Sequence, residues 1–96
     1  MTKHRKFRFQ LYVAGDAPNS ALAITNLTAI CRTYLADSHE IEVVDVFKEP
    51  KRALAEGIYM TPTLIKLAPA PVRRIVGTLS QTQIVVEAFG LGAATP

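Results

Sequence analysis

The chain has 96 residues, of which 49% are hydrophobic and 20% charged, and this composition is typical of a single globular domain. No apolar stretch approaches the roughly 20 residues needed to cross a bilayer and no secretory signal is visible, so we expect a cytoplasmic protein without a membrane partner. The net charge of +3 comes from a basic arm over residues 1–6 together with Arg8, whereas the rest of the chain is slightly acidic, so nucleic acid is not expected as a partner.

The first half of the chain predicts a strand, a long helix and a second strand. Apolar and polar residues alternate over residues 7–13, which indicates a strand with one apolar face. Pro18 begins a helix that Asn19 or Ser20 is expected to cap, and an apolar stripe at helical spacing extends this helix to Leu35. Residues 41–46 are rich in β-branched side chains and predict a mostly buried second strand, connected to the first by a right-handed parallel crossover.

The second half begins with a short helix, which is expected to start at Pro50 and to end at Gly57. Residues 63–67 and 72–76 predict a third and a fourth strand. Pro69 and Pro71 restrict the segment between these strands to a turn or an extended link, because proline cannot donate a hydrogen bond to a sheet.

A last helix is expected over residues 84–89. Ser80 and Gln83 have the spacing of a capping box, in which each side chain binds a backbone N–H of the other residue. Residues 91–96 are expected to form a frayed tail. The resulting order, β-α-β-α-β-β-α, predicts an α/β fold of the thioredoxin-like type over a single domain, residues 1–96.

The residues that perform redox chemistry in such folds are missing. Thioredoxin-like enzymes place a nucleophilic cysteine at the start of the first helix, because the helix N-terminus stabilises a thiolate. Residues 16–20 contain no cysteine, and we interpret Ser20 as a helix cap because no histidine lies near it in sequence. Cys31 is interpreted as a small buried hydrophobe, with a redox enzyme that uses Cys31 alone as the less favoured alternative. His4 and His39 are too far apart to suggest a metal site, so the sequence predicts no enzyme, no metal and no cofactor.

Among the charged residues on predicted strands, Asp45, Arg73 and Arg74 each have a predicted role. Asp45 is interpreted as a carboxylate that caps nearby backbone or pairs with a lysine or arginine, in preference to a catalytic role. Arg73 and Arg74 are neighbours on a strand and therefore point to opposite faces of the sheet. One arginine is expected to anchor an internal carboxylate, with Asp45 as the candidate, while the other contacts a partner. Alternatively, both arginines lie on the surface and protect an edge strand from pairing.

Several short segments, in this order and spacing, resemble the KaiB family of bacterial clock and clock-like proteins. They are LYVAG at 11–15, PNS at 18–20, VVDV at 43–46, Pro50, TPTL at 61–64 and PVRRIVGTLS at 71–80. The resemblance implies a non-enzymatic regulatory protein that binds a KaiC-type P-loop ATPase in clock or stress-related signalling, and that self-associates as a dimer or tetramer. The alternative is a thioredoxin-like oligomerisation or scaffold domain without an ATPase partner.

The resemblance also implies two folds, because family members rearrange their C-terminal half, roughly from Thr61 onward, between a self-associating ground state and a thioredoxin-like monomer. It implies a cis peptide bond at Pro62. Pro62, Pro69 and Pro71 are expected to slow this rearrangement, since isomerisation at proline takes tens of seconds. Clock members often have glycine where this chain has Ala88, and alanine favours a helix interior by roughly 1 kcal/mol. We therefore expect the thioredoxin-like fold to be more populated here than in clock members.

Besides Arg73 and Arg74, the resemblance implies a part in partner binding for three further positions. Clock members often carry basic residues where this chain has Leu22, Glu42 and Gly57. Because loss or reversal of charge at an interface rim slows association and weakens specificity, these substitutions predict a partner surface that differs from that of a standard clock member.

Overall fold

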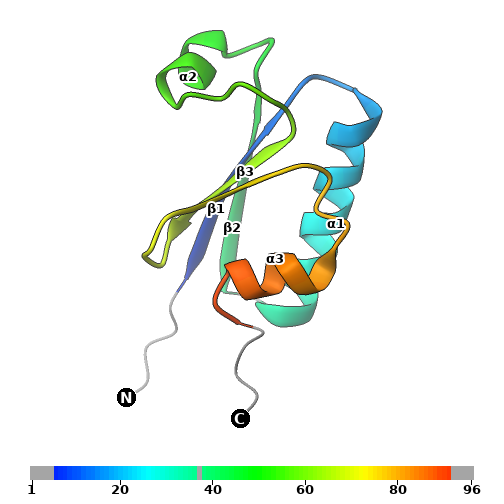
Figure 1. Ribbon diagram of the computed structural model, residues 1–96, viewed down its shortest axis with the longest axis vertical. Coiled ribbons are helices and arrows are strands. Elements are labelled where there is room, and N and C mark those ends of the chain that lie inside the picture. Colours follow the sequence, from blue (N-terminus) through cyan, green and yellow to red (C-terminus); the bar gives the residue numbers. More distant parts are fainter. Residues whose placement is uncertain (1–5, 37, 92–96) are drawn as a thin grey trace.

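A four-stranded mixed sheet and three helices make up the part of the chain that the computed structural model describes, residues 6–36 and 38–91 (Figure 1). In chain order these elements are β1 (Phe7–Val13), α1 (Pro18–Tyr34), β2 (His39–Asp45), α2 (Pro50–Ala55), β3 (Thr63–Ala68), β4 (Arg73–Val76) and α3 (Thr82–Ala88). The predicted element order is confirmed. The basic arm lies outside the described residues except for Lys6, and the tail lies outside them except for Leu91.

The strands lie in the order β2-β1-β3-β4, so β2 and β4 are the two edges of the sheet. Strand β1 pairs in parallel with β2 and antiparallel with β3, and β4 is antiparallel to β3. The edge position of β4 agrees with the alternative interpretation of Arg73 and Arg74, in which both lie on an edge strand. The expectation of a mostly buried second strand is wrong, because β2 has a neighbour on one side only and buries Val44 alone.

The two faces of the sheet differ in how they are covered. Helices α1 and α3 cover the first face, whereas α2 lies against one end of the second face (Figure 1). The alternation along β1 directs Phe7, Phe9, Leu11 and Val13 into the main core and Tyr12 into the smaller one. The smaller core contains only Tyr12, Val44, Ala53 and Ile65 as buried members among the described residues.

Both predicted side-chain caps are absent, because these side chains bind elsewhere. Helix α1 begins after Ala17, and the Ser20 hydroxyl accepts a hydrogen bond from the Ala14 N–H in the preceding loop. Helix α3 begins after Gln81 without a side-chain cap. The capping box is wrong because Ser80 accepts a hydrogen bond from the Thr78 hydroxyl, while Gln83 donates to Glu87.

The C-terminal half has the thioredoxin-like arrangement, with a helix over Thr82–Ala88. The peptide bonds before Pro62, Pro69 and Pro71 are all cis, which confirms the expectation for Pro62. Ala88 is the last residue of α3 and does not lie in its interior, so the propensity argument applies to it less strongly than expected. The relative population of the two folds stays a prediction. No helix in the described part of the chain is long and apolar enough to cross a membrane.

Candidate functional site

The junction between β1 and α1 is built as a hydrogen-bonded loop and holds no nucleophile of the thioredoxin kind. Ser20 is buried, and its hydroxyl accepts the Ala14 N–H at 3.0 Å. One carboxylate oxygen of Asp45 accepts the backbone N–H groups of Gly15 at 3.2 Å and Phe47 at 2.9 Å. The backbone-capping interpretation of Asp45 is confirmed, and its proposed pairing with Arg73 or Arg74 is wrong.

Cys31 is fully buried in the main core, as its place in the helical stripe predicted. Burial raises the pKa of the Cys31 thiol to about 12, so the thiol is protonated at neutral pH. Because the thiolate is the reactive form of cysteine, this environment disfavours redox chemistry at Cys31. In the described part of the chain, no three His, Cys, Asp or Glu side chains gather as a metal site.

Ionic contacts concentrate on the second face of the sheet, around α2. We call this surface the α2 face and define it by Gln10, Glu42, Arg52, Glu56, Gly57 and Arg74. Arg52 donates from its two terminal nitrogens to the two carboxylate oxygens of Glu42, at 2.8 and 3.0 Å. Such a two-point contact fixes the relative orientation of the two side chains. Helix α2 is thereby tied to the edge strand β2.

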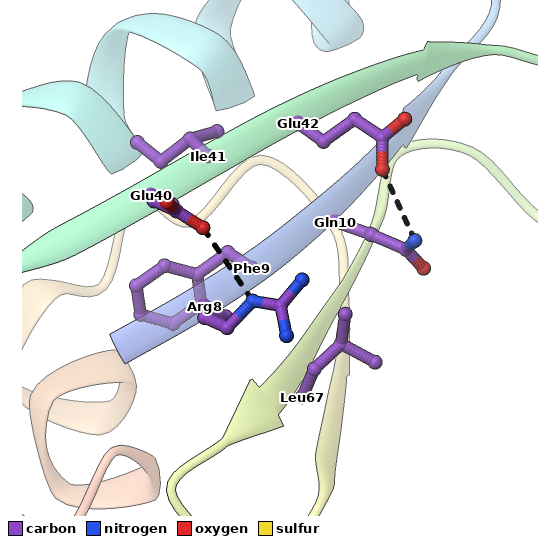
Figure 2. Close-up of a pocket in the computed structure, with 7 residues that line it drawn as sticks. All are labelled: Arg8, Phe9, Gln10, Glu40, Ile41, Glu42 and Leu67. Carbon is purple, nitrogen blue, oxygen red and sulfur yellow. Dashed lines mark hydrogen bonds and ion pairs between the residues drawn. The ribbon is translucent and has the colours of Figure 1, made fainter. Parts of the chain in front are cut away.

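Two further side chains extend this contact. Gln10 donates to Glu42 at 3.2 Å, as Figure 2 shows, and Arg52 also donates to Glu49 at 3.2 Å. Hydrogen bonds from Arg52, and then from Gln10, hold the pKa of the Glu42 carboxyl below its ordinary value. Hydrogen bonds to Glu42, and then to Glu49, raise the pKa of Arg52. The Glu42 charge predicted from the sequence to face a partner is therefore already neutralised by its own chain.

Arg74 makes the second connection between α2 and the sheet. Its guanidinium donates to the backbone carbonyl of Glu56 at 2.6 Å and lies 3.4 Å from the Glu56 carboxylate. Gly57 follows directly, with a φ of +68°, a backbone conformation that strains any residue with a side chain. The structure thus brings Glu42, Gly57 and Arg74 to one surface, although they come from β2, the end of α2 and β4.

Leu22 and Arg73 lie apart from that surface. Leu22 is 51% exposed on α1, which covers the opposite face of the sheet. The strand register places Arg73 opposite Lys66 and Arg74 opposite Ile65, so the two arginines point to opposite faces as predicted. Lys66 is buried, with its ammonium group 5.9 Å from the centre of the Phe7 ring. Arg73 belongs to this first face and not to the α2 face.

The sequence did not identify a group of exposed apolar side chains on and beside α2. Leu54 is 78% exposed and Tyr59 90% exposed, and Phe47 and Met60 are also largely exposed. Their signal in the sequence is weak, because Tyr59 and Met60 stand in a loop where no periodicity assigns a buried face. Contiguous exposed apolar surface is a common feature of protein–protein interaction sites.

A cavity of about 450 Å³ is lined by residues of β1, β2 and β3 (Figure 2). Its polar lining consists of Arg8, Gln10, Glu40 and Glu42, and Phe9, Ile41 and Leu67 complete the lining. Arg8 pairs with Glu40 at 3.5 Å, and Lys6 pairs with the same carboxylate at 3.2 Å. The charged side chains that line the cavity therefore have ion-pair partners within the chain.

Comparison with known proteins gives consistent matches over most of the chain. The family model described as the KaiB domain matches residues 10–90. The circadian clock protein KaiB3 of Synechocystis sp. is 43% identical over 77 residues, which cover 80% of this chain and 76% of that protein.

Two solved structures share the fold. The N-terminal domain of SasA from Synechococcus elongatus matches with a TM-score of 0.73 and 19% identity, over 91% of this chain and 83% of that chain. Chloroplastic thioredoxin z matches with a TM-score of 0.76 and 17% identity, over 93% of this chain and 80% of that chain. At these identities the two structures establish a thioredoxin-like fold and nothing further.

Proposed function

The chain belongs to the KaiB family, and from this premise we propose that it is a non-enzymatic clock-type regulatory protein. Its proposed partner is a KaiC-type P-loop ATPase, which it binds in the cytoplasm. The observation that carries the proposal is the KaiB-domain match over residues 10–90, because this range includes the entire α2 face. The buried, protonated thiol of Cys31 supports a binding role over a redox role.

The α2 face is the proposed partner surface. It brings together Glu42, Gly57 and Arg74, three of the positions at which the sequence analysis expected partner binding. Exposed apolar side chains, among them Leu54 and Tyr59, lie next to it and supply area that a partner can bury. Leu22 and Arg73 are proposed as separate contacts on the opposite face.

The charges of this surface predict a recognition mode that differs from that of a strongly basic surface. Glu42 is neutralised by Arg52, and Gly57 contributes no side chain. Arg74 is likewise paired with Glu56, so apolar contacts are proposed to contribute the larger share of the affinity. Since rim charges mainly affect association rate, binding should depend only modestly on salt concentration.

A calorimetric titration with the cognate KaiC-type ATPase and ATP tests this proposal. Replacing Leu54 with serine should weaken binding about tenfold, because exposed apolar contacts in an interface core are worth roughly 1–2 kcal/mol. Lys51 lies on the same helix and makes no ion pair with any described residue, so Lys51→Gln is the matched control and should bind normally. Binding of wild-type strength by Leu54→Ser would contradict the proposed surface.

The second candidate function is a thioredoxin-like scaffold domain that self-associates as a dimer or tetramer without an ATPase. The exposed group of Phe47, Leu54, Tyr59 and Met60 favours it, because the same apolar surface can be covered by another copy of the chain. Light scattering over a hundredfold range of protein concentration tests this candidate. It is supported if the molar mass of the wild type rises with concentration while that of Leu54→Ser stays at the monomer value.

A further inference from the structure

Helix α2 has little hydrophobic contact with the sheet on which it lies. Of its six residues only Ala53 is buried, whereas α1 buries five side chains. Ala53 contacts the small core of Tyr12, Val44 and Ile65. Helices in proteins owe most of their stability to the packing of an apolar face, and an isolated helix of six residues is unstable in water. Apolar packing therefore holds α2 only weakly.

Two arginine–glutamate contacts compensate by tying α2 to both edges of the sheet. Arg52 on the helix binds Glu42 on the edge strand β2, at 2.8 and 3.0 Å. Arg74 on the other edge strand, β4, binds the carbonyl and carboxylate of Glu56, the residue that follows the helix. The two contacts thus span the second face, and the small core lies beneath them.

We infer that α2 acts as a latch on the second face of the sheet. In the closed state the Arg52–Glu42 and Arg74–Glu56 contacts hold α2 against the sheet. In the open state, which is favoured when other ions compete for these charged side chains, α2 separates from the sheet. Opening uncovers Tyr12, Val44 and Ile65, which are almost fully buried in the closed state. The inference extends the proposed function, because the α2 face exists only while the latch is closed. It concerns the chain alone, however, so it can be tested without any partner.

The exposure of the paired side chains makes the latch sensitive to ions. Each side chain in the two pairs, Arg52 with Glu42 and Arg74 with Glu56, is between 37% and 52% exposed. Exposed ion pairs are screened when the Debye length falls from about 30 Å at 0.01 M salt to about 3 Å at 1 M. Local opening is governed by the contacts of the local unit alone, so screening should open α2 while α1, α3 and the central strands stay closed.

Amide hydrogen exchange of the isolated chain, followed by NMR with rapid mixing, measures this opening directly. The reporters are four N–H groups whose acceptors lie within or next to α2, namely those of Ala53, Glu56, Gly57 and Ile58. In Arg52→Gln, or in the wild type at 1 M sodium chloride, their exchange should accelerate about two- to fivefold, the range expected for loss of an exposed ion pair. The amides of Leu35 at the end of α1 and Phe89 at the end of α3 should keep their rates.

Lys51→Gln provides the matched control. It removes a positive charge from the neighbouring position of the same helix, and Lys, Arg and Gln have similar helix propensities. Its exchange rates should equal those of the wild type. The inference is overturned if Arg52→Gln and Lys51→Gln exchange alike, because the Arg52 contacts would then not hold the helix. It is also overturned if the Phe89 amide accelerates by the same factor as Ile58, since α2 would then open only with the whole fold.

Discussion

Replacing Phe89 with alanine is expected to lower the free energy of unfolding by about 3–5 kcal/mol, the usual cost of truncating a buried phenylalanine. Phe89 directly follows α3 and is 2% exposed. Its ring centre lies 4.7 Å from that of Phe9 and 6.5 Å from that of Phe7. Aromatic pairs at such distances contribute beyond their buried area, which favours the upper part of the range. Phe89 therefore packs the C-terminal helix α3 against β1.

The unfolding free energy lost in Phe89→Ala is large compared with the total stability of a domain of this size. At about 0.05–0.15 kcal/mol per residue, a chain of 96 residues has a total stability of roughly 5–14 kcal/mol. Urea unfolding followed by far-ultraviolet circular dichroism measures the difference. The control is Ile84→Ala on the same helix, where the side chain is 57% exposed and the expected change is within about 0.5 kcal/mol. A loss below about 1 kcal/mol in Phe89→Ala, similar to the control, would refute the packing of α3 on the first face.

Three further predictions concern Ser20, Glu42 and Cys31. Ser20→Ala should cost about 1–3 kcal/mol in urea unfolding, because it leaves the Ala14 N–H without its acceptor; a neutral result would contradict this contact. The pKa of Glu42 is lowered in the folded state, so its carboxylate stabilises the fold above its unfolded pKa and this contribution is lost as the pH falls through the folded pKa. An NMR titration should give a higher Glu42 midpoint in Arg52→Gln than in the wild type, and equal midpoints would contradict the assigned cause. Cys31 should resist iodoacetamide at pH 8 until urea unfolds the chain, as mass spectrometry can show; rapid labelling of the folded chain would be inconsistent with its burial.

The sequence predicted the elements because their patterns are strong and local. Alternation over residues 7–13 and the helical stripe between Pro18 and Leu35 each leave one interpretation. The burial of β2 could not be predicted in the same way, because Val43 and Val44 are equally apolar in a central and in an edge strand. The predictions of side-chain helix caps were wrong for a related reason. The Ser20 and Gln83 side chains have partners within hydrogen-bond reach other than helix N–H groups, and spacing alone does not choose between them.

The candidate site was predicted only in part. The sequence analysis pointed to Glu42 and Gly57 from the resemblance and to Arg74 from its strand, and the structure brings them to one surface. The sequence analysis did not predict every contact there. It did not predict the contact of Arg52 with Glu42, because many acidic residues lie within reach of a long arginine side chain and only the fold selects one. Asp45 illustrates the same limit. Its carboxylate binds two backbone N–H groups of adjacent loops, a geometry that exists only once β1 and β2 are paired.

The most direct test of a KaiB-type regulatory role is size-exclusion chromatography with light scattering, run on the chain together with the cognate KaiC-type ATPase and ATP. Our account predicts a complex heavier than the ATPase alone, which Arg74→Ala weakens and Lys51→Gln leaves intact. Elution of the wild-type chain apart from the ATPase at every concentration tested would contradict the account.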